Sequence, residues 1–228
     1  MKTTRTHLLK RSFPVIFSLT VTSLCLFGAA GRLNWWNAWV LLGLNFCASV
    51  TSMVLLGRDS ELLAERRNAR AGKSWDKLMV FIVVLLGPVA TWITAGLDAR
   101  FHWSEEMDVR AVAAGVAVAM LGAALVAWAM RTNRFFSAVV RIQEDRGHRV
   151  VTSGPYRFVR HPGYTGMAAF TLVTPLILNS RWAFLPATAT VAAMVLRTAL
   201  EDRTLRKELN GYVDYVRRVK YRLVPIVW

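Results

Sequence analysis

Residues 111–130 read AVAAGVAVAMLGAALVAWAM, a run of 20 residues without a charged side chain between Arg110 and Arg131. An α-helix of about 20 apolar residues is long enough to cross the hydrocarbon core of a bilayer. The run therefore predicts a membrane-spanning helix. It consists mostly of alanine, valine and glycine, and because small side chains let helices approach closely in lipid, it predicts a central place in a helix bundle.

Five further charge-free intervals accompany this run along the chain of 228 residues. They hold 20, 25, 20, 20 and 15 residues and lie between Arg11 and Arg32, Arg32 and Arg58, Lys77 and Asp98, Arg160 and Arg181, and Arg181 and Arg197. The interval between Arg160 and Arg181 carries Pro162 near its start and Pro175 inside it. The last interval is short, and its helix is expected to continue past Arg197. We expect an all-α, polytopic integral membrane bundle of about six transmembrane helices.

The composition agrees with a membrane protein. Hydrophobic residues make up 54% of the chain and the mean hydropathy is +0.35, which excludes a disordered chain. The two cysteines are too few for a disulfide scaffold. Basic residues before the first interval and small residues after it also resemble a signal peptide, but its apolar part is longer than a signal requires, which favours a retained helix.

The charge distribution predicts the orientation in the membrane. The net charge is +15, and 25 of the 29 Lys and Arg residues fall on one face of the expected bundle. Because positive charge stays on the cytoplasmic side, both termini are expected in the cytoplasm, and the charge is not a nucleic-acid footprint. Tryptophans gather at the opposite ends of the expected helices, as in an interfacial belt: Trp35, Trp36, Trp39, Trp103 and Trp182.

Two parts are expected within one integrated membrane domain. Residues 1–130 hold the first four helices, with a cytoplasmic segment at 57–77 that is interpreted as an interfacial helix on anionic lipid or as a lid over a pocket. Residues 131–228 hold a long polar loop, the last two helices and a cytoplasmic C-terminal tail. Because the polar residues gather on the cytoplasmic face, we expect any chemistry there.

Common sequence motifs of soluble enzymes are absent from the sequence. It contains no GxGxxG, Walker or HExxH pattern and no cysteine cluster, so neither a Rossmann-type nucleotide site nor a metal site is supported. Two polar segments remain as candidates. Residues 141–164 are rich in Arg, His and Tyr and are interpreted either as part of a functional site or as a solvated basic loop. Arg197 and Glu201 share a helix face and are interpreted either as a functional pair at membrane depth or as an ordinary ion pair.

These segments and the tail together resemble a known family. The string GPYRFVRHPGY at 154–164, the pattern Arg197…Glu201-Asp202, and the tail from Tyr212 to Pro225 are similar to the isoprenylcysteine carboxyl methyltransferases, within a wider group that includes phospholipid N-methyltransferases. The resemblance covers about the last hundred residues. It implies S-adenosylmethionine as the methyl donor and a lipophilic or lipidated acceptor that enters from the bilayer, in a multi-pass protein of the inner membrane if the source is bacterial.

The resemblance also implies the site residues. Arg197 matches the position that meets the acceptor, and Glu201 joins it in the catalytic centre. The implied cofactor pocket consists of Gln143, His148, Arg149, Val150, Val151, Tyr156, His161, Pro162, Gly163, Tyr164 and Glu201. The family often has a second glutamate where this chain has Asp202, so the role of that acid stays open.

Other functions remain as alternatives. The acceptor could be a phospholipid amine or a thiol instead of a carboxylate. A protein of another class, a transporter or a scaffold without enzymatic activity, is the second alternative. Transporters tend to show paired, broken helices near the middle of the membrane, whereas this sequence has no evident repeat and gathers its polar residues on one face.

Overall fold

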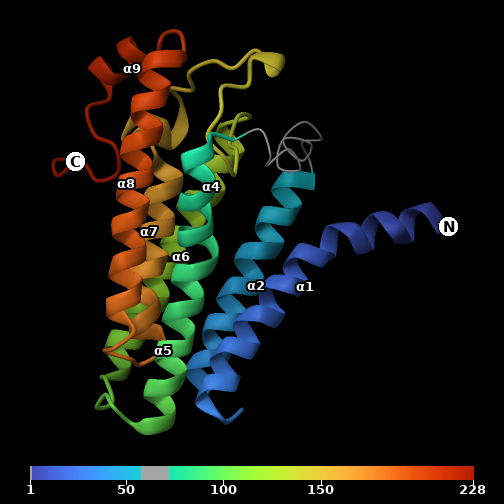
Figure 1. Cartoon of the computed structure of the whole chain (residues 1–228), viewed down its shortest axis with the longest axis vertical. Helices are drawn as coiled ribbons and strands as arrows, with labels where there is room; N and C mark the ends of the chain where they lie inside the picture. The colour runs from blue at the N-terminus through green and yellow to red at the C-terminus, as the bar shows by residue number, and fades with distance from the viewer. Residues whose placement is uncertain (1, 58–71) are drawn as a thin grey trace.

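The protein is a bundle of long helices that run side by side between two ends (Figure 1). Its computed structural model describes residues 2–57 and 72–228, and all regular elements in these ranges are helical. The elements are α1 (Lys2–Ala30), α2 (Trp36–Gly57), α4 (Ser74–Val80), the π-helical η2 (Phe81–Leu86), α5 (Gly87–Phe101), α6 (Val109–Thr132), the short turns η3 (Glu144–Arg146) and η4 (Gly154–Arg157), α7 (Pro162–Ile177), α8 (Phe184–Glu208) and α9 (Tyr212–Arg218).

Among the residues that the structure describes, five helical segments are long and apolar enough to cross a membrane. They are Ser12–Ala30, Trp36–Leu55, Ser74–Phe101, which joins α4, η2 and α5, Val109–Thr132 and Phe184–Glu208. Five of the six expected spans therefore meet this measure. The last of them continues past Arg197, as expected.

The remaining expected span is the shorter helix α7, with 16 residues. Its start is fixed at Pro162, because the residue before a proline is disfavoured in helical conformation, and His161 has φ −127° and ψ 60°. Its end follows closely after Pro175, where the Ser180 amide donates to the Pro175 carbonyl and Asn179 adopts φ +56°. The two prolines account for the shortfall against the expected span.

We call the two ends of the bundle the turn end and the loop end. The turn end contains the short connections at 31–35, 102–108 and 178–183 (Figure 1). There the buried Asp98 carboxylate accepts hydrogen bonds from the Ser104 amide and hydroxyl, both at 2.7 Å, and from the Ser180 hydroxyl. The loop end contains residues 133–161 and the C-terminal segment after α8.

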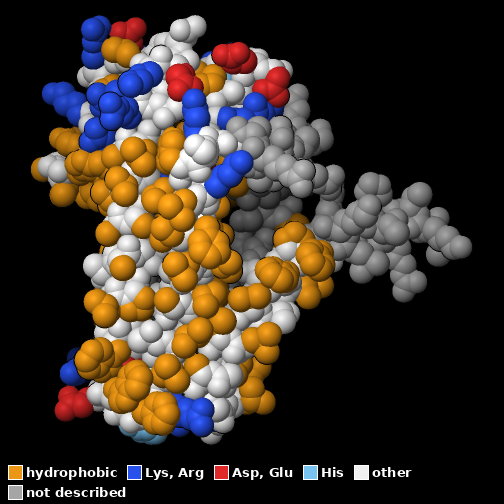
Figure 2. Space-filling model, in the orientation of Figure 1, with side chains coloured by type: hydrophobic (Ala, Val, Ile, Leu, Met, Phe, Trp, Pro, Cys, Tyr) orange, Lys and Arg blue, Asp and Glu red, His pale blue; other side chains and the backbone are white. Residues whose placement is uncertain are grey.

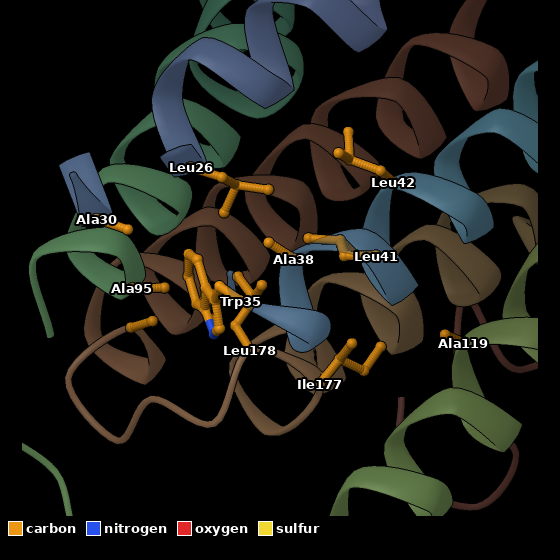
Figure 3. Close-up of a cluster of buried hydrophobic side chains, with 11 residues drawn as sticks. Leu26, Ala30, Trp35, Ala38, Leu41, Leu42, Ala95, Ala119, Ile177 and Leu178 are labelled. Atoms are coloured by element: carbon orange, nitrogen blue, oxygen red, sulfur yellow. The ribbon is translucent and has the colours of Figure 1, made fainter. Parts of the chain in front are cut away.

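The main apolar core lies toward the turn end, where α1, α2 and α7 meet (Figure 3). Leu26, Leu41 and Ile177 are 0% exposed in this core. Trp35 also packs there and is only 6% exposed, so its expected place in the interfacial belt was wrong. The other four tryptophans of that belt are each at least half exposed.

Helices α6 and α7 pack in close contact. A Cβ atom added at Gly122 would lie 2.6 Å from the Gly166 carbonyl oxygen, and one added at Gly166 would lie 2.4 Å from the Gly122 carbonyl oxygen. Such backbone contact requires a residue without a side chain. The expectation that the small residues of 111–130 serve close packing is confirmed.

The surface is divided into zones along the bundle. Figure 2 shows hydrophobic side chains over the middle of the visible face, with Lys, Arg, Asp and Glu gathered mainly at the loop end. This is the arrangement that a bilayer around the middle of the bundle requires. Most of the segment 57–77, interpreted as an interfacial helix or a lid, lies outside the described residues.

Candidate active site

Asp202 on α8 is the centre of an ionic network at the loop end. Its carboxylate accepts hydrogen bonds from Arg160 Nε at 2.8 Å and from the Tyr212 hydroxyl at 2.9 Å, while Arg206 and Arg222 approach it at 3.0 and 3.1 Å. The Asp202 and Arg160 side chains are each 1% exposed. The network ties the start of α7, α8, α9 and the C-terminal segment together.

The C-terminal segment runs along the residues that precede α7. The Arg160 amide donates to the Tyr221 carbonyl at 3.0 Å, and the His161 amide donates to the Arg222 carbonyl at 2.9 Å. Arg160 also holds this segment through its guanidinium, which donates to two further carbonyls at 2.7 Å. The three sequence segments 154–164, 197–202 and 212–225 therefore lie together in space.

Arg197 lies in a second cluster, deeper along α8. Its Nε atom is 2.7 Å from Asp76 Oδ1, and its guanidinium lies 5.3 Å from the centre of the Tyr164 ring. The Tyr164 hydroxyl in turn donates to Glu201 at 2.8 Å. The ion-pair partner of Arg197 is therefore Asp76, and the interpretation as an ordinary pair with Glu201 was wrong.

The neighbouring acids Glu201 and Asp202 differ in accessibility. The Glu201 side chain is 22% exposed, whereas that of Asp202 is 1% exposed and saturated with partners. His161 lies between them, with Nδ1 4.0 Å from Glu201 and Nε2 3.5 Å from Asp202. Only Glu201 retains room to meet a ligand, which gives Asp202 a structural role in the network.

Gln143 and His148 form a third group, around Phe135. The buried Gln143 amide donates from Nε2 to the Phe135 carbonyl at 2.9 Å and accepts from Arg146, and the His148 and Phe135 rings lie 4.6 Å apart. The Gln143 backbone amide also donates to His148 Nδ1 at 3.3 Å. These contacts fix the loop over 143–148 against the residues that follow α6.

Tyr156 lies in an apolar cluster between the loop and the C-terminal helices. Its ring packs with Val150 and Val151, its hydroxyl accepts from Asn133 at 3.2 Å, and its carbonyl accepts from Tyr215 at 2.7 Å. Burial raises the pKa of the Tyr156 hydroxyl, so the phenol stays neutral at physiological pH. It can present a hydrogen-bond donor and an aromatic face, but no phenolate.

Pro162 and Gly163, the remaining predicted cofactor residues, form the first turn of α7 and are buried. A Cβ atom added at Gly163 would lie 2.7 Å from the Phe136 ring, which itself belongs to the apolar cluster of Tyr156. Phe136 therefore connects the start of α7 with the Tyr156 cluster, and the absence of a side chain at Gly163 makes this contact possible.

A polar hollow of about 710 Å³ opens at the loop end. Three predicted cofactor residues line it, namely Arg149, Val150 and Val151. Arginines and valines stand side by side there, so the hollow offers both hydrogen-bond donors for an anionic group and apolar contacts for a flat ring. The full lining is Leu55, Met130, Arg131, Thr132, Arg134, Phe135, Arg149, Val150, Val151, Thr152 and Ser153.

A second, apolar cavity of about 630 Å³ lies within the bundle. It is lined by side chains of α2, η2, α5, α6, α7 and α8. Among these are Met167 and Met194, each one helical turn from Tyr164 and Arg197 respectively, on the side away from the loop end. The apolar cavity and the charged cluster are therefore neighbours.

The structure thus assembles the predicted residues in three adjoining groups: His161, Tyr164, Arg197 and Glu201; Gln143 and His148; and Val150, Val151 and Tyr156. Sequence reasoning missed Asp76, the partner of Arg197. The available signal was an isolated acid at the margin of an apolar span, which is a functional candidate in a membrane protein. It lies within segment 57–77, for which an interfacial helix or a lid was expected but no residue was assigned to the site.

A comparison with models of known protein families finds a match in the C-terminal half of the chain. Residues 115–207 match the model of the isoprenylcysteine carboxyl methyltransferase family. The resemblance inferred from the sequence motifs is confirmed over this region.

Individual proteins similar to this chain have names that agree with the matched family model. The protein-S-isoprenylcysteine O-methyltransferase of Rattus norvegicus is 30% identical over 171 residues, which cover 70% of this chain and 58% of the relative. Protein-S-isoprenylcysteine O-methyltransferase B of Arabidopsis thaliana is 29% identical over 113 residues, which cover 46% of this chain and 55% of the relative. The chain therefore spans somewhat more than half the length of these two relatives.

The fold is similar to a solved membrane enzyme. The structure described as the eukaryotic intramembrane Ras methyltransferase, isoprenylcysteine carboxyl methyltransferase, superposes with a TM-score of 0.57 and 21% identity, and covers 91% of this chain and 73% of that one. Together with the five apolar helices among the described residues, this likeness identifies the chain as a multi-pass integral membrane protein with a helical fold.

Proposed function

We propose that the protein is an S-adenosylmethionine-dependent methyltransferase that acts on a lipophilic acceptor, the carboxylate of an isoprenylcysteine-like molecule. One observation carries the proposal. The apolar cavity inside the bundle lies one helical turn from the cluster of Arg197, Tyr164 and Glu201. A molecule with an apolar tail and a charged head matches this arrangement, with the tail in the apolar cavity and the head at the charged cluster.

The residues at the loop end suit the proposed donor. The donor carries an amine, a carboxylate and an adenosine next to a sulfonium cation. Val150 and Val151 offer apolar contacts beside the Tyr156 ring, and Arg149 offers donors for an anionic group. Glu201 retains acceptor capacity for an amine or a ribose hydroxyl, and aromatic faces stabilise cations by about 0.5–2 kcal/mol.

The proposed reaction requires little acid–base catalysis by the protein. When bound, S-adenosylmethionine supplies an electrophilic methyl carbon and leaves as a neutral thioether. An acceptor carboxylate is already ionised, so no proton has to be removed before it forms the new oxygen–carbon bond. Arg197 would hold the carboxylate through the N–H donors of its guanidinium that remain free, and alignment of the two reactants would supply most of the rate enhancement.

The protein surroundings favour such a reaction. Arg197 is 4% exposed and lies over the Tyr164 ring, so few water molecules can reach the carboxylate that it would bind. A nucleophile with little hydration reacts more readily with a methyl cation equivalent. We also propose that the loop end faces the cytoplasm, in the inner membrane if the source is bacterial, because the loops at this end hold most of the Lys and Arg residues.

An acceptor screen tests this function. The full chain in detergent would be incubated with methyl-labelled S-adenosylmethionine and a prenylcysteine, a fatty acid, an aminolipid or a lipophilic thiol. We expect base-labile methyl ester only with carboxylate acceptors, and most with the prenylcysteine. Label on the amine or the thiol would establish another acceptor, and failure to bind the donor at all would favour a transporter or scaffold.

Arg197→Lys sharpens the test, because it keeps the charge and loses the planar guanidinium with its several fixed donors. With a carboxylate acceptor, turnover should fall by at least tenfold while donor affinity stays within about twofold. Unchanged turnover in Arg197→Ala, with donor affinity intact, would refute the role of Arg197 in acceptor binding.

A further inference from the structure

We propose that Asp76 is a positioning residue for the methyl acceptor: it fixes one edge of the Arg197 guanidinium so that the other edge faces the acceptor carboxylate. This inference rests on the proposed carboxyl methylation. Asp76 lies on α4, 121 residues before Arg197, and belongs to none of the three motif segments.

The contact between Asp76 and Arg197 is two-pronged. Arg197 Nε donates to Asp76 Oδ1 at 2.7 Å, and Nη2 is 3.2 Å from Oδ2. The Nη2 atom also donates to the Ala138 carbonyl at 2.9 Å, and the Val140 amide donates to Asp76 Oδ2 at 2.7 Å. Asp76 is 0% exposed, so its carboxylate is held by these donors and reaches no solvent. One edge of the guanidinium is therefore fixed in plane and in position.

The other edge of the guanidinium is open to a ligand. Arg197 Nη1 donates to no acceptor among the residues that the structure describes. Among the described residues, Nη1 is not one of the side-chain atoms that are fully enclosed without a hydrogen bond, so it retains contact with accessible space. The two N–H groups of Nη1 are charged donors that can hold a carboxylate oxygen.

The open edge lies where an acceptor head group is expected. Met194, one turn before Arg197 on α8, lines the apolar cavity, and so does Val83, two turns after Asp76 on the continuous helix of α4 and η2. The Asp76–Arg197 pair thus stands beside the cavity, on the side toward the loop end. An acceptor whose tail fills the cavity presents its head to this pair.

A purely structural role explains the pair less well. The start of α4 is already attached to its neighbours, because the Lys73 amide donates to the Val140 carbonyl and the Lys73 ammonium pairs with Glu208 at 2.8 Å. A buried ion pair adds little net stability compared with apolar packing of the same volume. The two-pronged geometry of the Asp76–Arg197 pair is better explained by a need to hold the guanidinium in one orientation.

An alternative role for Asp76 is competition with the acceptor, because Asp76 itself is a carboxylate bound to Arg197. If Asp76 competed with the acceptor for the guanidinium, its removal would tighten acceptor binding. If it positions Arg197, its removal weakens productive binding. The two roles therefore differ in the sign of the effect.

The experiment compares wild type and Asp76→Asn in the full chain in detergent. N-acetyl-S-farnesylcysteine serves as the carboxylate probe, its carboxamide serves as an uncharged competitor, and calorimetry measures donor binding. We expect kcat/KM for the carboxylate to fall about 10- to 100-fold. The inhibition constant of the carboxamide and the dissociation constant of S-adenosylmethionine should stay within about threefold, because neither depends on a carboxylate held by Arg197.

Two variants serve as controls. Lys73→Ala removes a second ion pair to α8, made by the residue that precedes α4 and not involving Arg197. Asp98→Asn removes a buried carboxylate at the turn end. Both should leave all three constants within about twofold of wild type. If Asp76→Asn does not bind the donor, Asp76→Glu carries the test, with a smaller loss of kcat/KM that is again confined to the carboxylate.

The outcomes separate the inference from the function. Wild type that forms no ester from the probe refutes the proposed function and the inference with it. Active wild type with an unaffected Asp76→Asn, or with an equal loss for carboxylate and carboxamide, overturns the inference alone. Tighter acceptor binding overturns it in favour of competition, and loss of donor binding in both Asp76 variants overturns it in favour of a folding role.

Discussion

Replacement of Asp202 by asparagine should strongly destabilise the loop end. The change keeps the size of the side chain but removes the charge that faces Arg160, and both side chains are 1% exposed. Removal of one partner from a buried ion pair typically costs about 3–5 kcal/mol, because the remaining charge stays buried. Arg206 and Arg222 are 40% and 28% exposed, and such partly exposed pairs add about 1 kcal/mol or less each.

We therefore expect a loss of about 3–5 kcal/mol in the free energy of unfolding, which is a large part of the 5–15 kcal/mol typical of a native protein. The measurement is equilibrium unfolding in mixed micelles, followed by tryptophan fluorescence. Limited proteolysis provides a local readout, since Arg160 also holds the carbonyls of Val219 and Lys220 and the C-terminal segment should become cleavable.

Lys73→Ala is the matched control for this prediction. It removes an ion pair with Glu208 whose side chains are 39% and 41% exposed, so it should cost about 1 kcal/mol or less. A loss below about 1 kcal/mol for Asp202→Asn, or equal losses for the two variants, would show that the network does not hold the loop end together.

Three further results are expected. Glu201→Gln and Tyr156→Ala should each weaken S-adenosylmethionine binding by about 1.5–3 kcal/mol in calorimetry, and unchanged affinity in both would remove them from the donor pocket. A single cysteine at position 147 should be labelled from the cytoplasm and one at position 104 only from the other side, so cytoplasmic labelling of position 104 would contradict the orientation. Gly122→Ala should lower the unfolding midpoint by several degrees because its Cβ would meet a backbone carbonyl of α7 at 2.6 Å, whereas Gly28→Ala, with nothing within 4 Å, should not.

The fold was largely predictable because charge-free intervals reflect a physical constraint of the bilayer. A span without charges has few alternatives to a helix in lipid, so five of the expected spans meet the length and composition required. The departures have local causes. Prolines at both ends shorten α7, and Trp35 turns into the core instead of the interface because it precedes α2 directly and packs against the residues of α1 and α7.

The site was predictable only in part, because motifs record residues and not their partners. The motif segments do meet in space, and Glu201 contacts Tyr164 within them. The partner of Arg197 escaped prediction because Asp76 is 121 residues away, and no periodicity within one helix connects the two. Which buried acid meets which buried base depends on helix packing, and the spacing of Arg197 and Glu201 pointed to a pair that does not form.

The geometry of α8 explains why two adjacent acids have separate tasks. Consecutive helical residues point about 100° apart, whereas residues three or four apart share a face. Met194, Arg197 and Glu201 therefore form one stripe, which leads from the apolar cavity past the guanidinium to the accessible carboxylate. Asp202 falls beside this stripe and faces Arg160. A single helix thus aligns the proposed acceptor path on one side and, on the other, anchors the loop and tail that surround the proposed donor, so a shift of α8 by one residue would disrupt both.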